Sequence, residues 1–379
     1  MSNKKSLWKI HAWLGLYVGA MILLFSITGS FIVFRAELDA ILNPTLYKVT
    51  ESKEKTVSLD GISKKVLLKY PNYYLHHFKF NGENKPFEVK IKPVKNYAKD
   101  KKKKDLDIFI NPANGEINGI REPESGLLYW VAKLHTNLLA GKIGRYIVGL
   151  FGLALLIMLV IGLFIYGNFM KKKRMTQIRW GEGTRKISAD WHKLLGITTV
   201  PFNLIWAITG ITFAFLPNIL EATIGKPNQT FAKPATLTKP IAIKPFSYDQ
   251  IVNSVVLNFP DAKIKTIREA YNDNPFIEVK LDYNSPLIKD DAAKLYIDKD
   301  RKEIISHFDP RLASLGTKLF YSQDPLHFGT FAGLWSKIIY SLFGLSSGIL
   351  FITGFVIYRK RKQTKNKINF SKCQTHLQL

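Results

Sequence analysis

The sequence predicts a membrane α-helical protein with four transmembrane helices in two parallel repeats and two extracytoplasmic α+β domains. Three observations carry this prediction. Uncharged apolar stretches are long enough to cross a bilayer, the polar stretches between them show helix and strand patterns, and the second half of the chain repeats the first. A hydrophobic content of 46% and a mean hydropathy of -0.01 fit apolar spans that alternate with polar domains.

The first predicted span covers residues 11–34 and contains no charged residue. At a rise of about 1.5 Å per residue, about 24 helical residues cross a hydrocarbon core of about 30 Å. The span recurs at residues 190–215. The matched residues are His11 with His192, Gly15 with Gly196, and Ile27-Thr28-Gly29 with Ile208-Thr209-Gly210.

The second span covers residues 147–167 and recurs as a fourth span near residues 338–358. The matched residues are Leu134-His135 with Leu326-His327, Ala140-Gly141 with Ala332-Gly333, Leu150-Phe151-Gly152-Leu153 with Leu342-Phe343-Gly344-Leu345, Gly162 with Gly354, and Tyr166 with Tyr358. Because each half has an even number of spans, both halves enter the membrane in the same orientation. A pseudo-twofold axis along the membrane normal then places matched residues at equal depth.

The first polar region predicts a helix that begins at Ser58 and stops at Pro71, three strands, and a turn at Asn114-Gly115. Residues 247–304 repeat this pattern, with Ser247 in the place of Ser58. The predicted strands are residues 76–80, 87–93 and 106–112 in the first region and 276–282 and 294–304 in the second. The lysine run at residues 101–104 is expected to be a solvated loop.

Basic residues predict the topology. Lys4, Lys5 and Lys9 precede the first span, and basic clusters at residues 171–174 and 359–362 follow the second and fourth spans. The positive-inside rule then predicts a multi-pass membrane protein with cytoplasmic N- and C-termini. The first span shows no small-residue cleavage site, so we expect a retained signal anchor.

The predicted organisation follows from these spans. It is a cytoplasmic N-terminus and first span (residues 1–36), a first outside domain (37–126), an interfacial segment and second span (127–170), a cytoplasmic loop (171–190), a third span (191–216), a second outside domain (217–325), an interfacial segment and fourth span (326–358), and a basic cytoplasmic tail (359–379).

Composition excludes several classes of protein. The net charge of +26 is explained by topology rather than by nucleic-acid binding. Cys373 is the single cysteine, so no cysteine cluster can bind zinc or an iron–sulfur centre, and any haem would be held non-covalently. The sequence contains no nucleophile triad, Walker loop or dinucleotide glycine fingerprint. The catalytic residues are therefore left unassigned.

Four of the eight histidines, His11, His135, His192 and His327, lie one at the start of each span. The pseudo-twofold pairs His11 with His192 at the cytoplasmic face and His135 with His327 at the opposite face. Two imidazoles facing each other across a helix bundle can ligate a b-type haem iron from both sides, so the four are candidate axial ligands of two haems. The alternative is that they are ordinary interfacial residues.

Glycines and cations near these histidines fit a haem or ordinary membrane packing. Gly29 and Gly210 are expected near the depth of the outer pair, and Gly162 and Gly354 near that of the inner pair. They either allow close approach of a flat macrocycle or mediate helix contacts. The cations that could bind haem propionates are Lys142, Arg145 and Lys337 at the outer face and Lys9 and Lys193 at the inner face. Snorkelling of long basic side chains to the membrane interface explains their positions equally well.

The other four histidines are interpreted as surface residues. His76 and His77 are adjacent, so on a regular strand they point to opposite faces and do not share a metal. His307 and His376 have no companion in the sequence.

The chain resembles the PepSY-associated transmembrane family. The resemblance is carried by the His-x-Trp-Leu-Gly-Leu opening at residues 11–16, the Thr-Gly pairs, Glu37-Leu38, Leu134-His135 and the paired helix-plus-strand domains. The family includes iron-regulated inner-membrane proteins and ferric-siderophore reductases. The resemblance implies PepSY folds for both outside domains, axial ligation by the four span histidines and reduction of ferric-siderophore iron in the periplasm. Glu37 has no counterpart near Leu216, so its role is not transferred to the second half.

The sequence interpretation is an inner-membrane dihaem oxidoreductase, a ferric-chelate reductase that passes electrons outward to a ferric siderophore. The cytoplasmic loops are too short for a flavin or nicotinamide domain, so the electron donor is expected to be quinol or another reductase. Membrane lipid is the other expected partner. The alternative is a haem-free scaffold or regulator whose PepSY domains bind a peptide or protein. A transporter is disfavoured because no acidic residue or helix break is expected in the spans.

Overall fold

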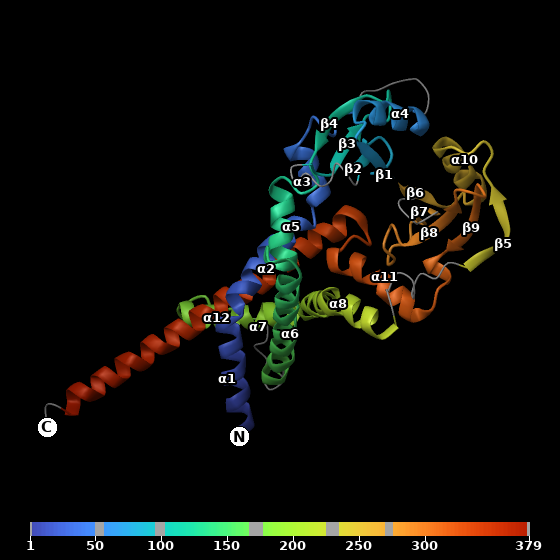
Figure 1. Cartoon of the computed structure of the whole chain (residues 1–379). Coiled ribbons are helices and arrows are strands. Elements are labelled where there is room, and N and C mark those ends of the chain that lie inside the picture. The colour runs from blue at the N-terminus through green and yellow to red at the C-terminus, as the bar shows by residue number, and fades with distance from the viewer. Residues whose placement is uncertain are drawn as a thin grey trace. The chain divides into compact units, whose positions relative to one another are not determined.

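The computed structural model describes residues 2–49, 57–94, 103–166, 177–224, 235–269 and 276–376. The chain divides into two compact units. The helical unit contains residues 1–34, 130–219 and 326–379, and the sheet unit contains residues 35–129 and 220–325. Both units therefore draw on the two halves of the sequence, and Figure 1 shows their elements.

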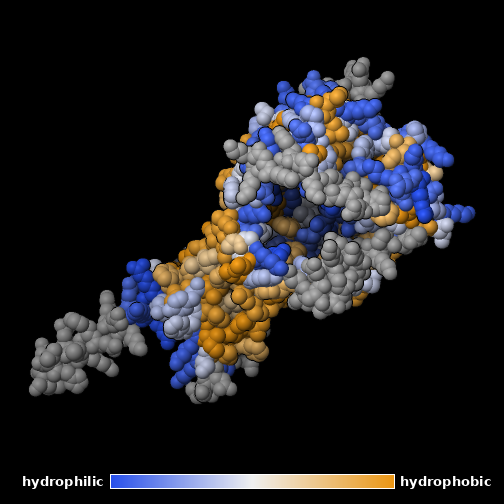
Figure 2. Space-filling view, in the orientation of Figure 1, coloured by the Kyte–Doolittle hydropathy of each residue, from blue (hydrophilic) through white to orange (hydrophobic). Residues whose placement is uncertain are grey.

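Apolar helices build the helical unit. They are α1 (Ser2–Tyr17), α2 (Gly19–Ile32), α5 (Leu127–Asn137), α6 (Gly141–Tyr166), α7 (Thr184–Thr198), α8 (Val200–Ile224), α11 (Leu315–Phe328) and α12 (Gly333–His376), of which α5, α8 and α11 extend into the sheet unit. Among the residues that the structure describes, three segments are long and apolar enough to cross a membrane, namely Gly141–Tyr166, Val200–Pro217 and Gly333–Thr364. A fourth span results if α1 and α2, which meet at 55°, count as one. Figure 2 shows the apolar side chains as a broad band on this unit.

Two expected spans are interrupted, and the expectation of unbroken helices is wrong. The first breaks at Val18, between α1 and α2, and the third breaks at Thr199, between α7 and α8. Val18 and Thr199 are 181 positions apart, the same separation as between His11 and His192. Gly19 weakens the first helix locally, and Pro201 lacks the N–H that a continuous helix would need, although it is tolerated in the first turn of α8.

The helix that contains the fourth predicted span is longer than the span. Helix α12 does not stop at Tyr358 but continues to His376, through the segment expected to be a basic tail. No glycine or proline follows Gly354, so the sequence offers no residue that ends the helix.

Small residues bring helices of the helical unit together. On α2, Ser26 donates a hydrogen bond to the Gly344 carbonyl of α12, and Ser30 donates to the Ser341 carbonyl. Gly152 of α6 lies close to Ile211 of α8, where an added Cβ would be 3.3 Å from the Ile211 side chain. Without side chains at these glycines, the helix backbones approach closely, which is the usual basis of helix association in a membrane.

A single antiparallel sheet of nine strands forms the centre of the sheet unit. Its order is β4-β3-β2-β1-β6-β7-β8-β9-β5. The strands are β1 (Tyr73–Lys79), β2 (Phe87–Pro93), β3 (Leu106–Ile110), β4 (Ile117–Arg121), β5 (Ala235–Ala242), β6 (Lys263–Arg268), β7 (Phe276–Asp282), β8 (Ala293–Asp298) and β9 (Glu303–Phe308). The strand order is symmetric about the β1–β6 pair except for the extra edge strand β5. The strands predicted at 76–80, 87–93, 106–112 and 276–282 and the turn at Asn114-Gly115 are confirmed. The strand predicted at 294–304 is wrong as a single strand, because a turn at residues 299–302 divides it into β8 and β9, and β5 and β6 were not expected.

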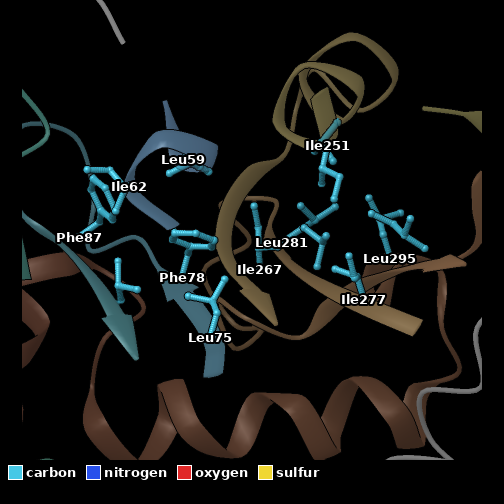
Figure 3. Close-up of a cluster of buried hydrophobic side chains, with 14 of the residues drawn as sticks. Leu59, Ile62, Leu75, Phe78, Phe87, Ile251, Ile267, Ile277, Leu281 and Leu295 are labelled. Atoms are coloured by element: carbon cyan, nitrogen blue, oxygen red, sulfur yellow. The ribbon is translucent and has the colours of Figure 1, made fainter. Parts of the chain in front are cut away.

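Alternating residues create the core on one face of this sheet. Val89 and Ile91 of β2 are fully buried, while Lys90 between them faces the other side. Helices α4 (Leu59–Lys69) and α10 (Tyr248–Asn258) contribute Val66 and Ile251 to the same core. Figure 3 shows side chains of both helices and of strands from both halves in one cluster. A short helix, α3 (Arg35–Leu42), is tied to the edge strand β4 by Arg121, whose Nη1 donates to both carboxylate oxygens of Asp39 at 2.7 Å.

The two core helices cap each other. Asp249 of α10 accepts hydrogen bonds from the Leu59 N–H at 2.7 Å and from the Ser58 hydroxyl at 2.6 Å, at the start of α4. In return, Asp60 of α4 accepts from the backbone N–H groups of Tyr248 and Asp249 at 3.1 and 3.0 Å. Each carboxylate satisfies N–H groups that a helix start leaves unpaired. The reciprocal caps therefore join the two halves of the sheet unit.

We expect Asp60→Ala and Asp249→Ala each to cost about 1 kcal/mol of unfolding free energy, the usual weight of a helix cap. Each change removes hydrogen bonds at the start of the other helix, and the two carboxylates belong to one network. Thermal unfolding of the full chain in detergent should therefore show a non-additive double mutant. Asp300→Ala, in the exposed β8–β9 turn, is the control. The capping argument would be contradicted if the two single substitutions cost no more stability than the control and their effects added in the double mutant.

The Asp60 cap should also depend on pH. Burial raises the pKa of Asp60, but the backbone N–H groups of Asp249 and Tyr248 outweigh it and hold the pKa below its usual value. Its stabilising contribution is therefore complete above about pH 4 and is lost as the pH falls further, through the folded-state value. The difference in melting temperature between wild type and Asp60→Asn should shrink over that range.

Candidate functional site

The structure brings His11 and His192 together. His11 lies on α1, His192 lies on α7, and their ring centres are 6.2 Å apart with planes at 90°. His135, near the end of α5, and His327, near the end of α11, are close enough to interact electrostatically. All four imidazoles belong to the helical unit, and each is partly buried. The histidines are thus near each other in the predicted pairs.

Threonine hydroxyls contact three of the four rings through Nδ1. His135 Nδ1 lies 3.0 Å from the Thr28 hydroxyl of α2, and His327 Nδ1 lies 2.6 Å from the Thr209 hydroxyl of α8. His192 Nδ1 lies 3.0 Å from the Thr353 hydroxyl of α12. The Thr-Gly pairs are evident in the sequence, and Thr28 and Thr209 stand next to the repeated glycines, but the contact of their hydroxyls with imidazoles is not evident there.

His11 is the exception. Its Nδ1 is buried and points toward the Met158 carbonyl of α6 without forming a hydrogen bond within the described chain. In the repeat, Ile161 of α6 occupies the position of Thr353. The residue that would supply a hydroxyl is therefore an isoleucine in the first half.

Glycines leave space for three of the rings. A Cβ at Gly29 would lie 2.9 Å from Cε1 of His135, and Cβ atoms at Gly162 and Gly354 would lie 3.5 Å from Cε1 of His11 and 3.4 Å from Cε1 of His192. At Gly210 a Cβ would meet nothing within 4 Å. Gly29, Gly162 and Gly354 therefore border imidazoles, while the approach of a macrocycle to these glycines stays a prediction.

Other contacts hold the ring-bearing helices. The Trp206 indole N–H of α8 donates to the His327 carbonyl at 3.0 Å, and Phe213 lies edge-on to the same imidazole. In the first half, Phe25 of α2 lies edge-on to His135. The ends of α5 and α11 are therefore fixed against α2 and α8.

The candidate propionate partners have different surroundings. Lys193 of α7 forms an ion pair with Asp190 at 2.9 Å, and Arg179 also binds Asp190 through two side-chain nitrogens. These hydrogen bonds from Arg179, together with Lys193, hold the pKa of Asp190 below its usual range. Arg145 of α6 has a buried Nε with no hydrogen-bond partner in the described chain. Lys9 and Lys142 are exposed.

The remaining histidines differ from their sequence interpretation. The strand has a β-bulge between Leu75 and His77, and the rings of His76 and His77 contact each other there, with their two Nδ1 atoms 2.7 Å apart. Burial and neighbouring cations lower the pKa of His76 to about 4 and that of His77 to about 3, so both are neutral at pH 7. The expectation that they point to opposite faces is wrong because the strand is not regular there.

His307 is not an isolated surface residue either, since its Nε2 lies 2.9 Å from the Tyr283 hydroxyl. The side chain of His376 and the basic cluster at residues 171–174 lie outside the described residues. Within the described part of the chain, no three His, Cys, Asp or Glu side chains are grouped as a metal site.

The apolar spans and the antiparallel sheet unit define a membrane protein of several helices with a large polar unit. The chain matches the PepSY-associated TM region over residues 8–361, and it belongs to this family. It is also 30% identical over 122 residues to the uncharacterized protein PA4219 of Pseudomonas aeruginosa. That match covers 29% of this chain and 30% of the length of the relative.

We expect Gly29→Ala to destabilise the helical unit by about 1–3 kcal/mol, because the new methyl group would displace the His135 ring from its position beside Thr28. Gly210→Ala, at the matched position, is the control and should be neutral or slightly stabilising. Thermal unfolding in detergent measures both. Equal effects of the two substitutions would show that the ring does not pack against Gly29 in this way.

Proposed function

We propose that this protein is a b-type dihaem oxidoreductase of the bacterial inner membrane that passes electrons outward to reduce the iron of a ferric siderophore. The observation that carries the proposal is the pairing of histidines in the helical unit. An iron atom bound by two imidazoles at about 2 Å from each nitrogen separates the ring centres by about 6 Å. The 6.2 Å between His11 and His192 fits this requirement.

The surroundings of the rings support the same proposal. Three imidazoles engage threonine hydroxyls through Nδ1, which leaves Nε2 for a ligand. His11 and His192 would hold one haem, and His135 and His327 the other. A haem bound in this way supplies one-electron transfer through its iron. Arg145, with its buried and unpaired Nε, is a suitable partner for a propionate.

A two-repeat arrangement is part of the proposal. The helix breaks at Val18 and Thr199, the threonines at 28 and 209, and the caps Ser58 and Ser247 occupy matched positions in the two halves. With both termini in the cytoplasm, the sheet unit would be periplasmic, and its helix-plus-strand halves would be two PepSY domains. Membrane quinol or a separate reductase would supply the electrons.

The release of iron follows from ligand chemistry. Ferric ion is a hard cation that binds oxygen chelators tightly, and reduction to ferrous ion weakens this binding. A siderophore reductase therefore needs only an electron at the acceptor, and no nucleophile or general base of this chain is required. We accordingly assign no further catalytic residue.

Two alternatives belong to other classes. A haem-free scaffold would use the threonine contacts simply to satisfy imidazoles within an apolar bundle. Two observations support the transporter alternative. The helices break at Val18 and Thr199, and beside the second break the buried Asn203 binds the Thr199 carbonyl and the Ser347 hydroxyl. Neither alternative requires a redox-active pigment in the purified protein.

The test is a reduced-minus-oxidised visible spectrum with a haem count. We expect two b-type haems in the wild type. His11→Ala and His192→Ala should lose the same haem, while His135→Ala and His327→Ala should lose the other, because removal of one axial ligand abolishes bis-histidine binding. His307→Ala, in the sheet unit, should keep both. Reduction of a ferric siderophore by the quinol-reduced protein would then be measured.

Absence of haem after expression with ample haem supply would exclude the electron-transfer function. The scaffold and transporter alternatives would then remain. A haem that survives all four histidine substitutions would likewise refute the assigned ligands.

A further inference from the structure

The threonines beside the imidazoles have only one hydroxyl hydrogen each, and its direction can be deduced. Thr28 donates to the Leu24 carbonyl at 2.7 Å, one turn back on α2. A carbonyl cannot donate, so the hydroxyl hydrogen must lie in this contact. The hydroxyl oxygen therefore accepts from His135, whose Nδ1 carries the proton.

The same deduction applies at the other two contacts. Thr209 donates to the Ile205 carbonyl at 2.6 Å, and Thr353 donates to the Ile349 carbonyl at 2.8 Å. Each oxygen is then left to accept from the Nδ1–H of His327 or His192. Three imidazoles are thus fixed in the tautomer whose Nε2 has a free lone pair.

Such a hydrogen bond also changes the strength of a ligand. An acceptor at Nδ1–H gives the imidazole more negative charge and makes Nε2 a stronger donor to a metal. A stronger donor favours the oxidised iron. The threonine oxygen is a good acceptor here because its own hydrogen is already engaged by a carbonyl.

The two histidine pairs are unequal in this respect. Both members of the His135–His327 pair have a threonine, whereas in the His11–His192 pair only His192 has one. Ile161 stands where the fourth threonine would be, and the buried Nδ1 of His11 has no hydrogen-bond partner in the described chain. The two halves of the chain therefore differ at the hydroxyl oxygen that would accept from Nδ1 and strengthen the histidine as a ligand.

We propose that Thr28, Thr209 and Thr353 are positioning residues that set the tautomer and donor strength of their histidines, and that Ile161 withholds this effect from His11, so that the two haems have unequal midpoint potentials. This inference rests on the proposed dihaem function. Two threonines act on one haem, and one threonine acts on the other.

Spectroelectrochemical titration of the purified full-length holoprotein tests the proposal. Thr28→Val and Thr209→Val should each raise the midpoint potential of the same haem, and Thr353→Val should raise that of the other. We expect about a fivefold change in the ratio of reduced to oxidised haem at fixed potential, the weight of one ordinary hydrogen bond. Ile161→Thr should shift the haem affected by Thr353→Val in the opposite direction.

Control variants separate the hydrogen bond from packing. Thr198→Val removes a hydroxyl that is exposed on α7 and bonded only to the Leu194 carbonyl, and it should move neither potential. Thr28→Ser keeps the hydroxyl without the methyl group and should retain the wild-type potential. If Thr28→Val loses its haem altogether, retention by Thr28→Ser supports the hydrogen bond, and loss in both variants overturns it.

Failure of this inference differs from failure of the proposed function. Two haems whose potentials do not respond to the threonine substitutions would overturn the inference and leave the dihaem function intact. A wild-type protein without haem would overturn both.

Discussion

An imidazole held among apolar helices needs a hydrogen-bond partner for the ring nitrogen that does not bind a ligand, because an unpaired buried polar atom is costly. For His135, His192 and His327 the partner is a threonine on a neighbouring helix, which can donate to its own helix and accept from the ring at the same time. This contact fixes where the ring-bearing helices lie against α2, α8 and α12. The geometry of the histidine pairs depends on it.

Close packing of the helices makes this contact possible. The hydroxyls of Ser26 and Ser30 bind carbonyls of α12, and Gly344 and Gly348 present no side chain at this interface. Glycines beside the rings serve the same end, because His135 occupies space that any side chain at position 29 would fill. Small residues thus serve two purposes in the helical unit, helix association and room for imidazoles.

The sheet unit joins the two halves of the chain by different means. Strand β1 of the first half pairs with β6 of the second, and the helices above them exchange caps through Asp60 and Asp249. One continuous core lies beneath both helices. The halves of this unit therefore cannot separate without losing sheet hydrogen bonds, helix caps and apolar burial together.

The sequence by itself determined the family, the apolar nature of the helical segments and most strands. Length, apolar composition and period-2 alternation are local properties, so the spans near residues 147–167 and the strand at 87–93 could be predicted directly. The internal match also singled out the four histidines, because each stands at the same position relative to its span.

Only the tertiary structure decided which atoms meet these histidines. The threonine contacts join residues more than a hundred positions apart, and no local pattern identifies such partners. The bulge that brings His76 to His77 and the helix break at Val18 likewise depend on packing and strand pairing. The sequence placed a histidine at the start of each span, but the fold determined that three have a hydroxyl partner and that His11 does not.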